Sequence, residues 1–355
     1  MLKNISQSQS TTNIQQEEYL NSNYYLFNNI RVFATISVII GHASNPLMRE
    51  LTSFNKAEWW IGNLFVSFFL SGLPLFIILS GVLLFDKSEK PGFYIARFKR
   101  IFIPFLFWNI IYGFINNIFD YSKGLDNTLN LFTTNSYHFW FVYVILILYI
   151  FFPILSFFIK KNKNKTLLYA TLFYLLLNIC YIFYNQIYPS SILFNFLFHA
   201  IIYSYHIVVS VIAFKWILQK SFKAGTVLYL FGFLISLFGT YFILNMEGFE
   251  NVTLHKSFNA HLLLKAFGAI IIIKYLTNIL GETVNRHTSR VSKYCFGIYF
   301  IHVLVLNKTF IKSLPISYNF SHHFILIGLN SIICFSVSLF IIYLLSKLPF
   351  GKYLF

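Results

Sequence analysis

Residues 139–159 read FWFVYVILILYIFFPILSFFI, and two lysines, Lys160 and Lys161, follow at once. No charged side chain interrupts this run, and its length matches the roughly 20 apolar residues with which a helix crosses the hydrocarbon core of a bilayer. The whole chain of 355 residues has the same character, with 57% hydrophobic and 11% charged residues and a mean hydropathy of +0.66. A soluble domain of this size has no interior for so much apolar surface. The sequence therefore predicts an integral membrane protein.

Nine further segments meet the same length requirement, so ten in all are predicted to span the membrane. The ten are approximately Leu26–Ser44, Leu64–Phe85, Ile101–Phe119, Phe139–Ile159, Leu167–Ile187, Ile192–Leu218, Thr226–Leu244, Ala260–Leu280, Tyr294–Phe310 and Phe324–Leu345. We therefore predict an all-α, polytopic membrane protein of about ten transmembrane helices. Residues 24–355 are predicted to form one membrane-embedded domain, since no polar linker or fixed-period repeat divides them. Residues 1–23 are polar and lack the apolar segment of a signal peptide, which is typical of a disordered tail.

Basic residues are concentrated in every second loop, as they are in loops that face the cytoplasm. The rich loops carry Lys87, Lys90, Arg97, Lys99 and Arg100, then Lys160, Lys161, Lys163 and Lys165, then Lys215, Lys220 and Lys223, and finally Arg286, Arg290 and Lys293. The loops between them carry fewer, which predicts that both termini and the tail are cytoplasmic. The net charge of +16 therefore indicates membrane orientation, and it does not indicate nucleic-acid binding.

The three cysteines, Cys180, Cys295 and Cys334, all fall inside apolar runs. They lack the spacing of metal ligands and do not form a disulfide framework. We interpret them as small buried apolar side chains, and we expect no metal site.

Two ionisable residues, Arg31 and His42, lie in the first predicted span. Charged and polar side chains inside a membrane are costly, so they often mark function. Eleven residues of helix return to within about 20° of the starting direction and rise roughly 16 Å. One helix face therefore presents a cation near the cytoplasm and an imidazole deeper in the membrane. A snorkelling Arg31 and a His42 at the outer interface would explain the same pattern.

This spacing of an arginine and a histidine on the first helix resembles the membrane acyltransferase-3 family, the O-acyltransferases of bacterial surface polysaccharides. Four further segments resemble family motifs in the expected order: Gly72-Leu-Pro74-Leu-Phe76-Ile-Ile-Leu-Ser80-Gly81, Phe93-Tyr94-Ile-Ala-Arg97-Phe-Lys-Arg100-Ile-Phe-Ile-Pro104, Tyr137-His138-Phe139-Trp140-Phe141 followed by Tyr149 and Pro153, and Phe296-Gly297-Ile-Tyr299-Phe-Ile-His302. The resemblance covers the chain after the tail and is nearest to the compact ten-helix branch that includes enterobacterial-common-antigen O-acetyltransferase. The chain departs from the family at Asn28 and Val32, where an acidic residue and a glycine are frequent.

The resemblance implies a protein of the bacterial cytoplasmic membrane that moves an acyl group, most often acetyl, from cytoplasmic acyl-coenzyme A to a sugar hydroxyl. The distance from Arg31 to His42 is comparable to the reach of a pantetheine arm from the phosphates to the thioester. The residue roles that follow are His42 and His302 as catalytic residues, Arg31, Arg97, Arg100 and Ser80 as coenzyme A ligands, and Tyr137, His138, Trp140 and Tyr299 as acceptor ligands. The implied partners are acyl-coenzyme A, the glycan acceptor and membrane lipid.

Each of these residues also has an ordinary structural explanation. Arg97 and Arg100 sit where cytoplasmic cations meet lipid headgroups. His302 would be explained as a buried neutral histidine. Trp140 would be explained as part of an aromatic belt at the membrane interface. Four further polar residues within spans remain without an assigned role: His199, His206, His261 and Lys265.

Two other functions fit a ten-helix membrane protein. A transporter or flippase for a lipid-linked sugar commonly shows inverted repeats and paired broken helices, and the sequence shows no such pairing. An accessory subunit of a polysaccharide synthase is the third alternative, and it would leave His42 dispensable.

Overall fold

The computed structural model describes residues 23–48, 57–85, 92–119, 137–187, 192–244, 260–308 and 320–354. Within these ranges every regular element is a helix. They are α2 (Tyr24–Ser44), η1 (Asn45–Met48), α3 (Ala57–Phe69), α4 (Gly72–Phe85), α5 (Phe93–Phe119), η3 (Tyr137–Phe139), α6 (Trp140–Lys161), α7 (Lys163–Ile187), α8 (Ile192–Ile217), α9 (Phe222–Leu244), α11 (Ala260–Ile279), α12 (Gly281–Ser292), α13 (Cys295–Lys308), α14 (Phe320–Leu345) and η5 (Gly351–Tyr353). The predicted tail lies outside the described residues apart from Asn23.

Eight helical stretches among the described residues are long and apolar enough to cross a bilayer. The two remaining predicted spans coincide with α7 and with α13, whose apolar part, Cys295–Leu306, is shorter than a full span. The prediction of an all-α, polytopic membrane protein is thus confirmed. The count of ten and the cytoplasmic termini stay predictions.

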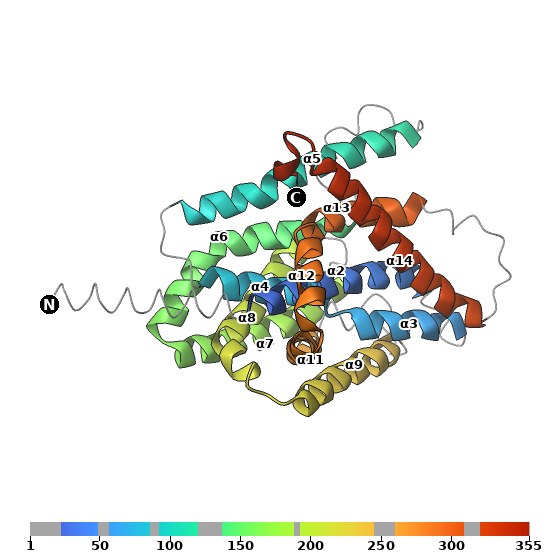
Figure 1. Cartoon of the computed structure of the whole chain (residues 1–355). Helices are drawn as coiled ribbons and strands as arrows, with labels where there is room; N and C mark the ends of the chain where they lie inside the picture. Colours follow the sequence, from blue (N-terminus) through green and yellow to red (C-terminus); the bar gives the residue numbers. More distant parts are fainter. Residues whose placement is uncertain are drawn as a thin grey trace.

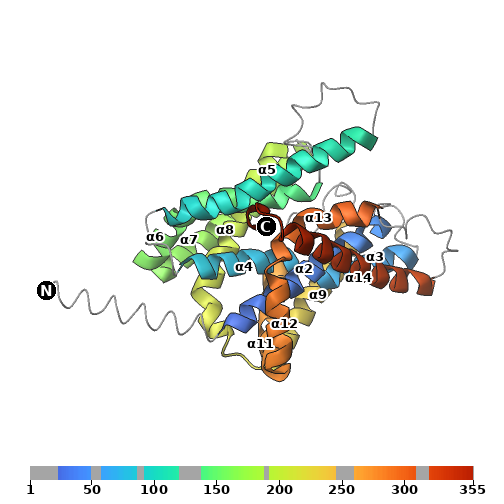
Figure 2. The same cartoon turned by 45° about the horizontal axis from the view of Figure 1, so that its top comes forward.

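Helix α2 lies at the centre of the bundle and packs against α3, α4, α11, α12, α13 and α14. Figures 1 and 2 show α2 and α4 between α5 and α6 on one side and α9 and α11 on the other. The buried apolar side chains form two main clusters, one joining α2 and α4 to α5, α6 and α13, and one joining them to α9 and α11. This helix, the first that the structure describes, is therefore held on both sides, which fixes the polar residues that it carries.

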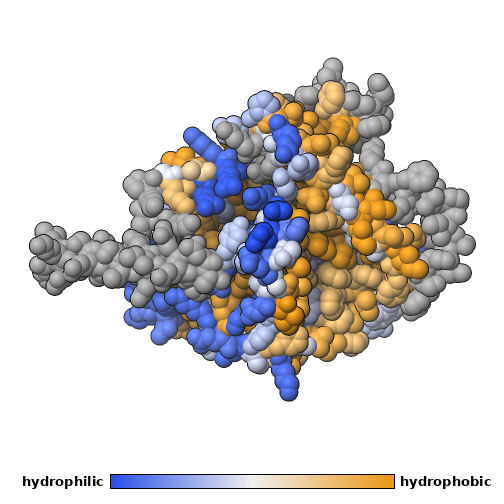
Figure 3. Space-filling view, viewed as in Figure 1, coloured by the Kyte–Doolittle hydropathy of each residue, from blue (hydrophilic) through white to orange (hydrophobic). Residues whose placement is uncertain are grey.

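The outer surface matches this arrangement. In Figure 3 a broad hydrophobic area covers α14 and α3, while hydrophilic side chains gather over α12. Side chains of α14 that are exposed include Ile325, Ile332 and Phe340. Such apolar exposure is what a helix that faces lipid requires.

Two features differ from what hydropathy predicts. The second span begins at Ala57 and consists of two helices, because α3 ends at Phe69 and α4 begins at Gly72. Pro74 has no N–H to continue the helical ladder, which favours an interruption one turn earlier. The basic connection between the eighth and ninth spans is itself the helix α12, which the apolar pattern does not reveal because its buried residues are polar.

Candidate functional site

A cavity of about 650 Å³ opens between α2, α4, α5, α6, α12 and α13. It brings together all four predicted coenzyme A ligands and one predicted acceptor ligand: Arg31, Ser80, Arg97, Arg100 and Tyr299. These residues lie on four different helices, so the sequence alone does not place them side by side. Tyr149, quoted above in the fourth-helix motif, also lines the cavity.

The cavity is strongly cationic. Besides Arg31, Arg97 and Arg100 its lining includes Lys293, at the end of α12, and no Asp or Glu is among the described residues that line it. Arg97 is partly buried and its guanidinium lies 5.3 Å from the centre of the Phe93 ring, whereas Arg100 and Lys293 are exposed. Four cations without a carboxylate form a site for an anion with several charges, because guanidinium groups bind phosphate oxygens in pairs.

Arg31 is oriented by Asn28, the residue that replaces the acidic side chain frequent in the family. The guanidinium donates to Asn28 Oδ1 at 2.7 Å, one turn earlier on α2. The same oxygen accepts from Ser292 Oγ at 2.9 Å, and Asn28 Nδ2 donates to Ser289 Oγ at 3.2 Å. An uncharged amide thus holds Arg31 in place, so the positive charge of the guanidinium is not neutralised by its partner.

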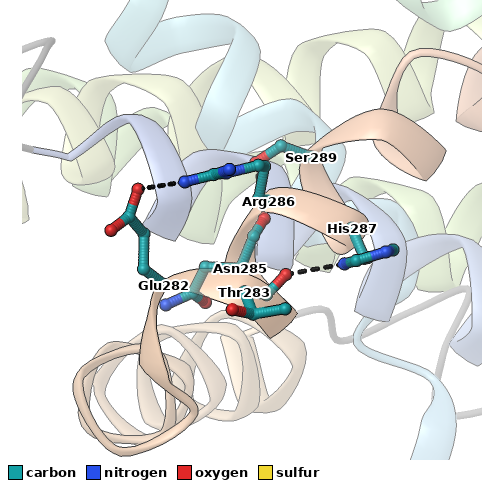
Figure 4. A network of polar contacts seen from close by, with 6 residues as sticks. All are labelled: Glu282, Thr283, Asn285, Arg286, His287 and Ser289. Carbon is teal, nitrogen blue, oxygen red and sulfur yellow. Dashed lines mark hydrogen bonds and ion pairs between the residues drawn. The ribbon is translucent and has the colours of Figure 1, made fainter.

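Helix α12 is attached to α2 by polar contacts on one face and is basic on the other. Asn29 Nδ2 donates to Asn285 Oδ1 at 2.8 Å, which adds to the contacts of Ser289 and Ser292. Figure 4 shows the exposed face, where Arg286 Nη2 bonds Glu282 Oε1 at 2.6 Å and His287 faces the carbonyl oxygen of Thr283. The hydrogen bond to Glu282 raises the pKa of Arg286. This helix therefore carries Lys293 to the cavity on a rigid support.

Three histidines from three elements meet beyond the inner end of the cavity. The ring centre of His302 lies 5.2 Å from that of His42 and 5.0 Å from that of His138, and the rings of His42 and His138 are 6.5 Å apart. His138 and His302 are fully buried, whereas His42 is partly exposed. The structure thus joins the two predicted catalytic histidines and adds His138, which the sequence suggests only as an acceptor ligand.

Backbone carbonyls determine which nitrogen carries the proton in two of these rings. His302 Nδ1 lies 2.7 Å from the carbonyl oxygen of Tyr299, which only accepts, so in the neutral ring Nδ1 carries the proton. Its Nε2 is then an acceptor, and it has no hydrogen-bond partner among the described residues. His138 Nε2 faces the carbonyl oxygen of Phe300 at 3.2 Å and is the protonated nitrogen of that ring. The cluster therefore contains a basic nitrogen that no donor from the described part of the chain occupies.

Tyr299 connects the cavity to the histidines. Its ring lines the cavity, lies 5.5 Å from His138 and 5.7 Å from His302 between ring centres, and its hydroxyl donates to the His138 carbonyl oxygen at 2.5 Å. Tyr299 is thus a lining residue of the cavity that also contacts the histidine cluster.

Tyr112 of α5 supports the cluster and was missed by the sequence analysis. Its hydroxyl donates to the Phe300 carbonyl oxygen at 2.9 Å and accepts from Leu304 N–H at 3.1 Å. In a regular helix these two backbone groups bond to each other. The hydroxyl is thus inserted into α13 around His302, and no pattern in the sequence around Tyr112 indicates this.

Trp140, another predicted acceptor ligand, does not share this cluster. Trp140 points toward α8, where its ring centre lies 5.2 Å from that of His199. The side chain of Tyr137 lies outside the described residues. His206 is buried, with its ring centre 5.2 Å from that of Tyr203. Trp140, His199, Tyr203 and His206 thus form an aromatic group between α6 and α8. This group is separate from the three-histidine cluster.

A family model described as an acyltransferase domain matches residues 24–347. No curated protein and no solved structure matches the chain significantly. Among the described residues no group of three or more His, Cys, Asp or Glu side chains could hold a metal ion.

Proposed function

Because the chain belongs to the acyltransferase-3 family of multi-pass membrane proteins, we propose that it transfers an acyl group from cytoplasmic acyl-coenzyme A to a sugar hydroxyl. The acyl group is acetyl, and the acceptor is a surface polysaccharide or its lipid-linked precursor. The membrane is the cytoplasmic membrane of a bacterium. Membrane lipid surrounds the protein, and the acyl donor is its only co-substrate.

The observation that carries this proposal is a cationic cavity that leads to a cluster of imidazoles. Coenzyme A ends in phosphates at one side and in a thioester at the other, so its binding site needs cations and a reactive centre some distance apart. Arg31, Arg97, Arg100 and Lys293 supply the cations. Tyr299 touches both the cavity and the histidines. A thioester that passes Tyr299 arrives at the cluster.

In the proposed reaction the acceptor hydroxyl oxygen attacks the thioester carbonyl carbon and the C–S bond breaks. His42 accepts the hydroxyl proton, and the coenzyme A sulfur leaves as a thiolate that is then protonated. Histidine suits this role because its ordinary pKa lies near neutrality. The partial exposure of His42 allows an acceptor to reach it, while the buried His302 offers Nε2 as a neighbouring proton acceptor.

The proposal is tested by mass spectrometry of surface polysaccharides from cells with and without the gene, combined with an assay of the purified protein. We expect an acyl ester that is present only with the gene, and radiolabel passing from [acetyl-¹⁴C]coenzyme A to a glycan extract. Identical polysaccharides, with no label transferred, would contradict the enzyme and favour the transporter or the accessory subunit.

Replacement of Tyr112 by Phe should lower kcat about tenfold while the KM for acetyl-coenzyme A stays within about twofold of wild type. The change removes one hydroxyl and leaves the ring, so α13 loses the inserted group that sets the turn around His302. Loss of a buried hydrogen bond costs about 1 to 3 kcal/mol, which permits such an effect. Steady-state kinetics of the purified variant measure it, with Tyr343→Phe on the exposed surface of α14 as the control. Wild-type kcat in Tyr112→Phe would show that the inserted hydroxyl has no catalytic consequence.

A further inference from the structure

The second membrane span is interrupted at Leu70 and Ser71. Leu70 N–H still bonds the Val66 carbonyl oxygen at 2.9 Å, but Ser71 N–H turns back to the Phe69 oxygen at 2.7 Å. In a continuous helix the carbonyl of Ser67 would accept from Ser71, and that of Phe68 from residue 72. The carbonyl groups that lose their helical donors at this interruption include those of Ser67 and Phe68, and an unpaired backbone group inside a membrane is costly.

Two side chains from neighbouring helices take these two carbonyls. Lys265 Nζ of α11 donates to the Ser67 oxygen, and the Tyr229 hydroxyl of α9 donates to the Phe68 oxygen at 2.7 Å. Lys265 is fully buried. A cation at the carboxyl end of a helix is also favoured by the helix dipole, which is negative there.

The hydrogen-bond partner of the ammonium group is this helix end. All 11 Asp and Glu residues of the chain lie outside the ten spans predicted from the sequence, and Glu58, the one carboxylate in the observed second span, lies in the first turn of α3, more than two turns before Ser67. Close packing of α9 on α11 fixes the lysine stem, since a Cβ atom at Gly232 would lie 2.6 Å from Lys265 Cγ. The lysine lies outside the lining of the cavity, and the proposed reaction does not use it.

The interruption determines where α4 lies. Just after it, Gly72 passes so close to α2 that a Cβ atom there would lie 2.6 Å from the Ala34 carbonyl oxygen. Further along, α4 provides one wall of the cavity through Phe76, Leu79 and Ser80. A shift of the helix end at Phe69 would therefore move the wall that faces the bound donor.

We propose that Lys265 and Tyr229 form a latch that holds the interruption of the second span and thereby positions the α4 wall for the acyl donor. The two are positioning residues, and the proposal rests on the proposed function only in the identity of that donor. The latch explains why a fully buried lysine is present in a membrane helix.

The test compares Lys265→Met, Tyr229→Phe and Lys274→Met in the purified full-length protein. Lys265→Met removes the ammonium group with little change in volume, and the KM for acetyl-coenzyme A should rise about tenfold while kcat at saturating donor stays within about twofold. Tyr229→Phe should raise the KM for acetyl-coenzyme A about threefold. Lys274 lies on the same helix and donates to the Leu218 carbonyl oxygen beyond the end of α8, so its variant controls for loss of a lysine and should keep the wild-type KM.

Hydrogen exchange gives a second measurement that does not depend on the substrate. Amides of residues 70–73 and 75 should exchange faster in Lys265→Met and in Tyr229→Phe than in Lys274→Met. If Lys265→Met does not fold, Tyr229→Phe carries both measurements. Wild-type KM and wild-type exchange in the latch variants would overturn the latch. A wild-type protein that neither binds nor uses acetyl-coenzyme A would overturn the proposed function, and exchange alone would then decide on the latch.

Discussion

His42→Ala should lower glycan acylation by about 10² to 10⁴, the range that removal of a positioned general base produces. Its imidazole is the partly exposed member of the three-histidine cluster, so no neighbour reaches an incoming hydroxyl equally well. The cavity lining does not include His42, and the affinity for acetyl-coenzyme A should therefore stay near the wild-type value. Radiolabel transfer measures glycan acylation, and calorimetric titration with acetyl-coenzyme A measures the affinity.

Two further histidine variants make this result specific. His302→Ala should lose less activity if it serves His42 through Nε2, because its ring does not meet the acceptor directly. His206→Ala removes an imidazole that is as buried as that of His302 but packs on Tyr203, outside the three-histidine cluster. The activity per folded protein should be retained in this variant. A His42→Ala protein that keeps most of its acylation activity would remove His42 from the reaction.

The double variant Arg97→Ala, Arg100→Ala should bind acetyl-coenzyme A about 10 to 100 times more weakly than wild type. Hydrogen bonds to charged groups contribute about 1.5 to 3 kcal/mol each when shielded, and less when solvent screens them. Arg97 is partly buried and Arg100 exposed, so Arg97 should account for most of the loss. The remaining affinity should depend less on salt, because fewer cations meet the phosphates.

Lys99→Ala is the matched control, since Lys99 is exposed on the same helix and does not line the cavity. It should bind the donor as wild type does. Lysine at both arginine positions should restore affinity in part, because an ammonium group supplies charge without the paired donors of a guanidinium. Equal affinities in the double variant and in Lys99→Ala would refute the assignment of the two arginines.

Eight of the ten predicted spans were found from the sequence because hydropathy is a local pattern. Hydropathy finds a helix such as α6 without knowledge of its neighbours, and the spacing from Arg31 to His42 is a property of one helix. Other features depend on contacts between distant segments. The insertion of Tyr112 into α13 and the attachment of Asn28 to α12 join residues 192 and 264 positions apart, and no local signal marks either. The residues at the interruption after Phe69 do not lower the local hydropathy. Hydropathy therefore predicts one continuous span across it.

The central place of α2 has a consequence for biosynthesis. Among the described helices this one is made first, yet its partners Ser289 and Ser292 lie on α12, which is made late. At about 5 to 20 residues per second, the 261 positions between Asn28 and Ser289 correspond to roughly 13 to 50 s of translation. During that interval Asn28, which orients Arg31, lacks its partners on α12, and a charged residue in a membrane helix without a fixed environment is costly. Chains that stop before α12 should therefore be recognised as unassembled and degraded, which ties survival of the protein to completion of its catalytic centre.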